Sequence, residues 1–364
     1  MNIHNSKNLI DSYNSSKQFL ENGESKHWKN LNKSKLDLFF NAIDQNLSHL
    51  KKFRSDKFLS KGLDDAVETQ FIPDVFFKLA EKNGAEKSLS YLQDKNVGES
   101  EHCLNIFNKY MDYHELFLVD YACILENHVL CNLSNPIICE IGGGYGSLAR
   151  MICSKHASKY ILIDLPETNL LSGYYLDQHF SSAGKKILYF SDLKKDHLSL
   201  SDIQDYDFII IPPNIDFTED LKIDLFINTR SMMEMNFSTI EKYFALIQKS
   251  IKPEGYFLNI NRYIKKTVGE EIMISRYPYD DQWRVTLSEK AFMQDHIHLL
   301  LAQRGTAEGS NIHVELELLE AHAKKYFEAD SVIFLRKLLR HLKMLVPASV
   351  KRKLKSLLLS DKPE

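Results

Sequence analysis

The segment Glu140–Gly146 reads E-I-G-G-G-Y-G and directly follows the apolar run Pro136–Cys139. Three of its glycines stand at alternate positions, and an acidic residue lies two places before the first of them. A second apolar run, Tyr160–Ile163, ends at Asp164. This spacing predicts a strand, a glycine turn, a helix and a second strand that ends in a carboxylate, which is the frame that binds an adenosine-bearing cofactor.

The glycine turn and Asp164 have separate expected tasks. A side chain on the turn would keep a cofactor away from the backbone, and glycine adopts the positive φ angles that such a turn uses. Asp164 lies 22 residues after Gly142, where a carboxylate can accept hydrogen bonds from both ribose hydroxyls. A glycine turn without a ligand is disfavoured, because alternating glycines weaken the start of a helix.

Two further residues bear on which cofactor the turn takes. The third position of the dinucleotide fingerprint is Ser147 here, where glycine or alanine is expected. Glu140 would repel a diphosphate, but it would suit the amino group or the sulfonium side of S-adenosylmethionine. The pattern E-x-G-x-G-x-G therefore favours S-adenosylmethionine over a dinucleotide such as NAD.

Length and charge limit the remaining classes. At 364 residues the chain is long enough for two domains, or for one domain with large extensions. The net charge of −3 hides an asymmetry, because Ser331–Ser360 holds eight Lys and Arg residues and no Asp or Glu. The rest of the chain is therefore acidic, which argues against a nucleic-acid partner.

Cysteine usage and the chain start predict a cytoplasmic protein. The five cysteines form no C-x-x-C pair, so we expect reduced core thiols, with Cys139 in a strand and Cys153 in the next helix. The polar start lacks the apolar region of a signal peptide, and no stretch approaches the length of a membrane span.

Residues 1–134 are predicted to be mainly helical, forming a cap on the substrate side or a dimerisation region. An apolar stripe from Leu36 to Leu50 follows helical spacing, and similar patterns occur around Phe76–Ala80 and from Cys103 to Leu130. Ser134–Pro136 then marks the entry to the first strand.

From 135 to 305 strands and helices alternate, which predicts an α/β fold with a mainly parallel sheet and helices on both faces. The expected strands are Ile137–Ile141, Tyr160–Asp164, Leu225–Asn228 and Tyr256–Ile260, with an antiparallel edge pair at Trp283–Leu287 and Ile297–Leu301. Two runs compete for the third strand, Ile187–Phe190 and Asp207–Ile211. The second is preferred because it lies closer to the fourth strand.

Local signals place two of the helices. Pro166 suits the first turn of the helix after the second strand. Ser238 and Glu241 have the spacing of a capping box at the start of the helix after the fourth strand.

Residues 306–364 are expected to form a C-terminal helical extension that is basic and amphipathic from about Val332. Leucines at helical spacing alternate there with Lys and Arg, interrupted at Pro347. Such a helix can lie on an anionic membrane surface. It can also dock on the protein's own acidic body or on a partner in a homodimer.

The chain resembles the sugar O-methyltransferases of bacterial surface-glycan gene clusters, within the class I S-adenosylmethionine fold. The resemblance covers roughly Asn96 to Arg304. Its matching stretches are Cys139–Ala149, Leu162–Glu167, Asp224–Met235, Tyr277–Trp283 and His296–Leu301. It implies transfer of a methyl group from S-adenosylmethionine to a sugar hydroxyl of a capsule, lipooligosaccharide or related glycan.

The resemblance also implies a cofactor site. The glycine turn would face the methionine part of the donor, the end of the second strand the ribose, and the turn after the third strand the adenine. Residues after the fourth strand would lie near the sulfonium. The expected cofactor residues are Glu140, Gly142, Gly143, Gly144, Tyr145, Asp164, Leu165, Pro212, Asn214, Asn228 and Ser231, with Asp192 as the alternative at the adenine turn.

A sugar hydroxyl is neutral at pH 7, so a base must take its proton. Glu234 is the first candidate, because it follows the fourth strand among methionines whose burial can raise its pKa. The competing interpretation is that Glu234 holds a neighbouring loop through hydrogen bonds. His296 and His298 are the other candidate bases; on a strand they would share one face.

A third set of residues is expected to bind the acceptor. Asp280, Asp281 and Trp283 can line a sugar site, unless they form a turn around a core tryptophan. Glu234, Asp280 and Asp281 are oxygen ligands of the type that divalent metals use, although no spacing demands a metal. The alternatives to a methyltransferase are an NAD-dependent nucleotide-sugar oxidoreductase and a non-catalytic donor-binding subunit of a glycan-assembly complex.

Overall fold

The computed structural model describes residues 3–20, 47–55, 66–193, 195–266, 269–305 and 309–324. The predicted basic helix from Val332 lies outside the described residues, as does Leu36 of the N-terminal stripe. The membrane contact and the homodimer that depend on these segments stay predictions. None of the described helices combines the length and the hydropathy that a bilayer crossing requires.

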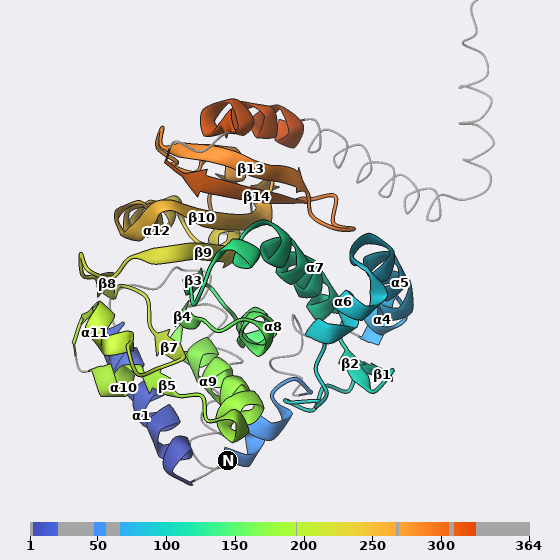
Figure 1. Cartoon of the computed structure of the whole chain (residues 1–364), viewed down its shortest axis with the longest axis vertical. Coiled ribbons are helices and arrows are strands. Elements are labelled where there is room, and N and C mark those ends of the chain that lie inside the picture. The colour runs from blue at the N-terminus through green and yellow to red at the C-terminus, as the bar shows by residue number, and fades with distance from the viewer. Residues whose placement is uncertain are drawn as a thin grey trace, which may run out of the picture.

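A nine-stranded sheet forms the centre of the described chain (Figure 1), in the order β15-β13-β14-β10-β9-β3-β4-β7-β5. Six neighbouring strands, β10 to β5 in that order, are parallel, whereas β14, β13 and β15 add antiparallel pairs at one edge. The strands are β3 (Ile137–Ile141), β4 (Lys159–Ile163), β5 (Ile187–Tyr189), β7 (Phe208–Ile211), β9 (Ile223–Thr229), β10 (Ile251–Arg262), β13 (Trp283–Lys290), β14 (Ile297–Arg304) and β15 (Ser310–Asn311). The predicted parallel sheet with an antiparallel edge pair is confirmed.

Both competing runs for the third strand are strands. The preferred run forms β7 and pairs directly with β4, so it has the expected place in the sheet. The other run forms β5, which pairs with β7 at the outer edge.

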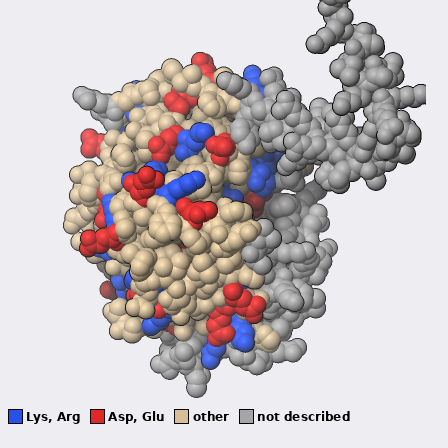
Figure 2. All heavy atoms as spheres, turned by 90° about the vertical axis from the view of Figure 1, so that its right-hand side faces the viewer, with Lys and Arg blue, Asp and Glu red and all other residues tan. Residues whose placement is uncertain are grey.

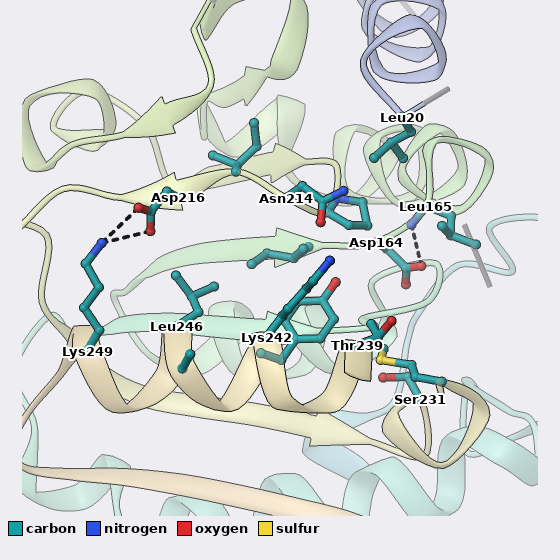
Figure 3. Close-up of a pocket in the computed structure, with 17 residues that line it drawn as sticks. Leu20, Asp164, Leu165, Asn214, Asp216, Ser231, Thr239, Lys242, Leu246 and Lys249 are labelled. Carbon is teal, nitrogen blue, oxygen red and sulfur yellow. Dashed lines mark hydrogen bonds and ion pairs between the residues drawn. The ribbon is translucent and has the colours of Figure 1, made fainter. Parts of the chain in front are cut away.

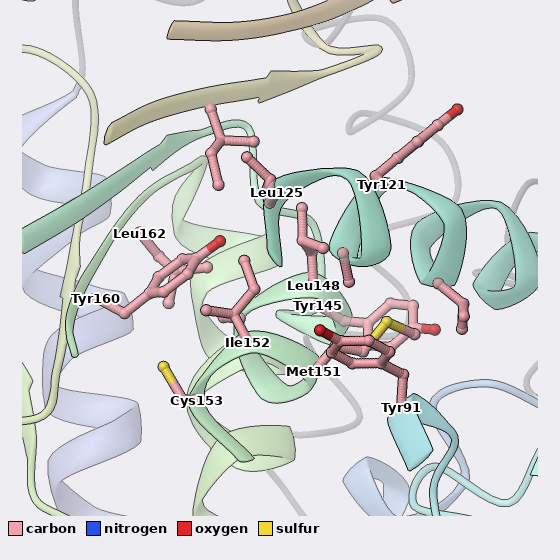
Figure 4. Packing of buried hydrophobic residues seen from close by; sticks show 14 of the residues in the cluster. Tyr91, Tyr121, Leu125, Tyr145, Leu148, Met151, Ile152, Cys153, Tyr160 and Leu162 are labelled. Atoms are coloured by element: carbon pink, nitrogen blue, oxygen red, sulfur yellow. The ribbon is translucent and has the colours of Figure 1, made fainter. Parts of the chain in front are cut away.

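Helices cover both faces of the sheet. One apolar cluster packs beneath α7 (Tyr113–His128), α8 (Ser147–Lys155) and α9 (Pro166–Phe180). The other packs beneath α10 (Phe190–Leu193), α11 (Leu200–Ile203), α12 (Phe237–Ser250) and a helix at residues 312–324. In the first cluster Leu148 and Ile152 of α8 lie over Tyr160 and Leu162 of β4 (Figure 4). Buried apolar strands with helices on both sides are typical of parallel sheets.

The N-terminal elements pack beside the sheet. They are α1 (Ile3–Phe19), η2 (Leu47–Lys52), α4 (Ala66–Thr69), α5 (Ile72–Asn83) and α6 (Ala85–Tyr91). The prediction of continuous helix from Cys103 to Leu130 is wrong, because a hairpin of β1 (Leu104–Ile106) and β2 (Lys109–Met111) precedes α7. Phe107 and Asn108 form its turn with φ of 56° and 58°, the positive values that tight hairpins require.

Short elements complete the described chain. They are η3 (Leu130–Asn132), η4 (Ser181–Ala183), β6 (His197–Leu198), β8 (Asp216–Phe217), η5 (Met232–Glu234), β11 (Ile264–Lys265), β12 (Ile272–Met273) and η6 (Ile274–Arg276). On the face over α5 and its neighbours, acidic and basic side chains are interspersed (Figure 2).

The predicted capping box at Ser238 and Glu241 is wrong. α12 begins two residues earlier than expected, with Asn236 as its N-cap. The Asn236 side chain accepts a hydrogen bond from the Thr239 backbone N–H at 2.9 Å. Asparagine caps at least as well as serine, so the earlier residue takes the position.

A buried network of charges joins the N-terminal elements to the sheet domain. Glu115 of α7 is fully buried and accepts hydrogen bonds from Ser147 Oγ at 2.7 Å and from Gln93 Nε2 at 2.8 Å. Arg150 lies 3.9 Å from the same carboxylate, and Arg54 pairs with Asp112, the N-cap of α7. Burial alone would raise the pKa of Glu115, but the two arginines and the hydrogen bonds outweigh it and lower the pKa.

We expect Glu115→Ala to destabilise the protein by about 3–5 kcal/mol, because it leaves buried arginine charge without its partner. Asp295→Asn is the control; it removes an exposed ion pair with Lys290 and should cost less than about 1 kcal/mol. Urea unfolding followed by circular dichroism measures both values. Equal midpoints for the two variants would contradict the role assigned to Glu115.

Candidate functional site

The turn from β3 to α8 is held against two other strand ends. Gly142 has φ of 75°, and a Cβ there would lie 2.0 Å from Ser231 Oγ after β9. Gly144 has φ of 57°, and its N–H donates to Asp164 Oδ2 at 2.8 Å. Glycine at 142 is therefore a steric requirement, whereas at 144 the backbone angle alone favours it.

Asp164 follows β4 at the carboxyl edge of the sheet. Its Oδ1 accepts the Leu165 N–H at 2.7 Å, and its Oδ2 accepts the Gly144 N–H. Burial raises the pKa of Asp164 to about 6, although these hydrogen bonds act in the opposite direction. The Thr168 side chain also hydrogen-bonds this carboxylate. A carboxylate has about four acceptor sites, so Asp164 keeps capacity for a ligand.

A cavity of about 430 Å³ opens beside Asp164 (Figure 3). Of the predicted cofactor residues, Gly142, Asp164, Leu165, Asn214 and Ser231 line it. The cavity has the size and the mainly apolar lining of a small-molecule site.

Of the two turns expected to face adenine, only one contributes residues to the cavity. Asn214, in the preferred turn, lines it together with Pro213, whereas Pro212 does not. The alternative residue Asp192 is exposed on α10 and is absent from the lining. The turn after β7 is therefore the one that reaches this site.

Sequence reasoning missed the wall that α12 contributes. In Figure 3 this helix runs along one side of the cavity, where Lys242 points toward Asn214 and Asp164, Thr239 lies near Asp164, and Leu246 points toward Asp216. Met235 and Tyr243 add apolar surface, and Leu20 closes the wall from the end of α1. The helical spacing of 239, 242, 246 and 249 was the available signal, since it defines a second face beside the buried one.

Glu140 does not line the cavity. It lies on the sheet face beneath α8, is 1% exposed and accepts a hydrogen bond from Tyr160 OH at 2.8 Å. Burial raises its pKa to about 7, and the charge of Asp164 adds to the rise. The structure therefore does not support the expectation that Glu140 meets a sulfonium or repels a diphosphate, because its side chain is enclosed and burial favours its neutral form.

The other predicted cofactor residues that are absent from the lining are Gly143, Gly144, Tyr145 and Asn228. A Cβ on Gly143 would meet Leu162 at 2.5 Å, and Tyr145 packs edge-on against Tyr175. Asn228 is fully buried and supports the turn instead, because its Nδ2 donates to the Ile141 carbonyl at 2.7 Å.

The first turn of α8 is closed to a phosphate. Ser147, Leu148 and Ala149 are buried, and Ser147 is bonded to the Glu115 carboxylate. A dinucleotide site needs free N–H groups at this helix terminus to bind the pyrophosphate. The packing of α7 therefore removes the feature that such a cofactor uses.

The three candidate bases lie near the carboxyl edge in different settings. Glu234 pairs with Lys265 of β11 at 2.7 Å, which ties η5 to the strand after β10. His298 is buried between Tyr263 OH and Ser288 Oγ at 3.1 and 2.8 Å, and burial lowers its pKa to about 4. His296 directly precedes β14, so only His298 lies on the predicted strand.

Asp280, Asp281 and Trp283 lie at the opposite edge of the sheet from the glycine turn. Trp283 pairs with Arg304, the last residue of β14, and is fully buried. Asp280 forms a double hydrogen bond with Arg304, and Asp281 pairs with His313. The expected sugar stack on Trp283 is corrected to a core tryptophan, because the ring is enclosed and far along the strand from the cavity.

The predicted oxygen ligands are not brought together. Glu234 lies at the carboxyl edge and Asp280 at the amino edge, where β14 ends. Within the described residues, no group of three His, Cys, Asp or Glu side chains has an arrangement that could hold a metal ion.

No protein-family model matches the chain, and no curated protein matches it. Several solved structures are similar to the chain. The mitomycin 7-O-methyltransferase MmcR is 15% identical over 53% of this chain and 57% of its own length, with a TM-score of 0.33. The pyocyanin biosynthetic protein PhzM is 14% identical over 71% and 76%, with a TM-score of 0.35.

A third solved structure is the 1,6-didemethyltoxoflavin-N1-methyltransferase of Burkholderia thailandensis with bound S-adenosylhomocysteine. It is 11% identical over 52% of this chain and 79% of its own, with a TM-score of 0.37. Because these identities and TM-scores are low, the fold is assigned from the strand order of the sheet. The described chain has a mixed α/β fold, with a mostly parallel central sheet between two layers of helices.

The two glycines of the turn should respond differently to alanine. Gly144→Ala meets no atom within 4 Å and should cost about 1–2 kcal/mol for its left-handed backbone alone. Gly142→Ala adds a collision with Ser231, which should raise the cost by about a further 1–3 kcal/mol. Chemical unfolding gives both values, and equal costs would show that Ser231 can move away freely.

Glu140 should make stability depend on pH. Because its folded pKa is raised from 4.5 to about 7, the folded protein holds an extra proton between these values. Stability should therefore fall as pH rises through this window, by up to about 1.4 kcal/mol per pH unit. Asp164, whose pKa burial raises from 3.8 to about 6, adds a slope of the same sign at lower pH. We therefore expect Glu140→Gln to reduce the slope, most clearly between pH 6 and 7, and to be more stable than the wild type at pH 8, as measured by urea unfolding at several pH values.

Glu241→Gln, on the exposed side of α12, is the control for that measurement. An unchanged slope in Glu140→Gln would show that Glu140 is ionised in the folded protein across the window.

Proposed function

We propose that the protein is an S-adenosylmethionine-dependent methyltransferase that acts on a sugar hydroxyl. The observation that carries the proposal is the cavity where the glycine turn, Asp164 and Asn214 meet the polar and apolar side chains of α12. These residues come from the ends of three parallel strands, where open α/β sheets bind their ligands.

The residues present fit the adenosine part of such a donor. Asp164 offers carboxylate oxygens as acceptors for ribose hydroxyls, and it lines the cavity together with Gly142. Asn214, Tyr243 and Leu246 supply a polar group and apolar walls suited to adenine. When bound, the donor supplies a methyl group that its sulfonium has already activated. The protein's task is then to hold the acceptor oxygen in line with it.

Two observations favour this donor over NAD. The first turn of α8 is buried against Glu115, so it offers no open phosphate site. Ser147 also occupies the third position of the dinucleotide fingerprint. The argument against a diphosphate therefore rests on α8 and not on Glu140.

The sugar acceptor is supported by the resemblance of Asp224–Met235, which forms β9 and the turn beside the cavity. The matching stretch Tyr277–Trp283 gives no such support, because it packs at the opposite edge. Glu234 and His296 both lie at the carboxyl edge, and we keep both as candidates for the group that takes the hydroxyl proton. His298 is disfavoured as the base, because both of its ring nitrogens are hydrogen-bonded to Tyr263 and Ser288.

Donor binding can be tested with S-adenosylhomocysteine and NAD. We expect S-adenosylhomocysteine at about 100 times its Kd to stabilise the wild type by about 2.7 kcal/mol, and NAD to leave it unchanged. Asp164→Asn should weaken S-adenosylhomocysteine binding at least tenfold, because a neutral amide replaces the ribose acceptor. Asp192→Asn is the matched control, since it alters an exposed aspartate outside the cavity. Thermal unfolding and calorimetry measure these effects, and stabilisation by NAD alone would reject the proposal.

A further inference from the structure

Arg230 has a backbone conformation that arginine rarely adopts. Its φ is 65°, in the left-handed region, at the end of β9 and next to the cavity residue Ser231. Residues outside glycine reach this region mainly where the surrounding structure forces them, often at functional sites.

Hydrogen bonds from both flanks hold the strained turn. The Arg230 N–H donates to the Ile260 carbonyl at 2.7 Å. The Met232 N–H donates to Asn228 Oδ1 at 3.2 Å, and the Met233 N–H donates to Asn261 Oδ1 at 3.0 Å. Asn261 also donates to Asn228 at 2.8 Å, so the two buried amides brace one another. The turn is therefore fixed by the sheet and does not depend on the arginine side chain.

The guanidinium of Arg230 has no hydrogen bond or ion pair with any residue that the structure describes. It is partly exposed and lies near two tyrosines of α7, Tyr113 and Tyr121. Burial raises the pKa of both phenols, and the charge of Arg230 opposes the rise in each. This places one unpaired positive charge between α7 and the end of β9.

Tyr121 is a second group that lacks a partner. The residue is 1% exposed, and its hydroxyl makes no hydrogen bond within the described structure. Its ring extends away from the packed side chains of Leu125 and Leu148 (Figure 4). A buried hydroxyl without a partner is costly, so its presence beside an unpaired cation points to a ligand that would satisfy both.

A guanidinium and phenol hydroxyls are hydrogen-bond donors that together favour an anionic ligand. Guanidinium binds planar carboxylate and phosphate oxygens through paired N–H donors, and a phenol adds a further donor. Glu68 also faces Tyr113, but it pairs with His114 at 3.0 Å.

We propose that Arg230, together with the hydroxyls of Tyr113 and Tyr121, binds a carboxylate or phosphate group of the methyl acceptor. This inference rests on the proposed function and narrows its substrate class to charged sugars. The methionine carboxylate of the donor is the other anion near this edge. Arg230 is absent from the cavity lining, whereas its neighbour Ser231 is part of it, so the acceptor is the better match.

The test uses the full chain and three sugars that differ in charge: glucose, glucuronate and glucose 1-phosphate. Calorimetric titrations at fixed ionic strength are run with and without saturating S-adenosylhomocysteine. We expect glucuronate or glucose 1-phosphate to bind the wild type at least tenfold more tightly than glucose. The charged sugar that binds better distinguishes a carboxylate from a phosphate acceptor.

Arg230→Asn should abolish this preference, because asparagine tolerates a positive φ but carries no charge. Arg230→Lys should keep part of the preference, and Tyr121→Phe should weaken binding of the charged sugar several-fold. The control Arg276→Asn removes an exposed arginine that faces Glu271, and it should leave all three affinities unchanged.

Three results would overturn the proposal: equal binding of all three sugars by the wild type, an intact preference in Arg230→Asn, or a loss of S-adenosylhomocysteine affinity in that variant. The third result would assign Arg230 to the donor. If S-adenosylhomocysteine fails to bind the wild type, the proposed function fails. The titrations without it still decide the role of Arg230.

Discussion

The buried carboxylate of Glu115 is the contact on which the rest of the arrangement depends. It belongs to α7, yet its partners come from the first residue of α8, from Gln93 after α6 and from Arg150 one turn along α8. A buried charge needs an oppositely charged or hydrogen-bonding partner at close range, because the free-energy cost of removing each charge from water is large. The N-terminal elements are therefore docked on the sheet domain in one orientation, and α8 is held with its first turn covered. That covering leaves the glycine turn open on the other side, toward Asp164.

A second set of buried polar groups fixes the opposite side of the site. Asn228, Asn259 and Asn261 form a row across β9 and β10, and Ser231 Oγ donates to the Ile141 carbonyl before the glycine turn. The glycine turn and the β9 turn are thus parts of one hydrogen-bonded unit. Its rigidity explains how Gly142 can lie against Ser231 and how Arg230 can keep a left-handed backbone. A ligand at this edge meets groups that are already positioned.

The two edges of the sheet have different tasks. At the carboxyl edge, Asp164, Asn214 and Arg230 keep polar groups available to ligands. At the amino edge, Asp280, Arg304 and Trp283 satisfy one another through a double hydrogen bond and a stacked guanidinium. The segment around Trp283 contains residue types that often bind sugars. Its contacts with Arg304 show that it packs at the end of the antiparallel strands instead.

The features that could be determined from the sequence alone depend on interactions between residues that are close together in the chain. Apolar runs of four or five residues predicted β3, β4 and β7, because buried parallel strands need no polar face. The glycines and Asp164 located the turn that borders the cavity, because their spacing follows from one strand, one turn and one helix. Contacts between residues distant in the chain decided the rest. Asn236 displaced Ser238 as the cap of α12, Glu140 turned toward Tyr160, and α12 supplied a cavity wall. The sequence also could not show that no described residue pairs with the Arg230 guanidinium, because such pairing depends on which side chains folding brings near it.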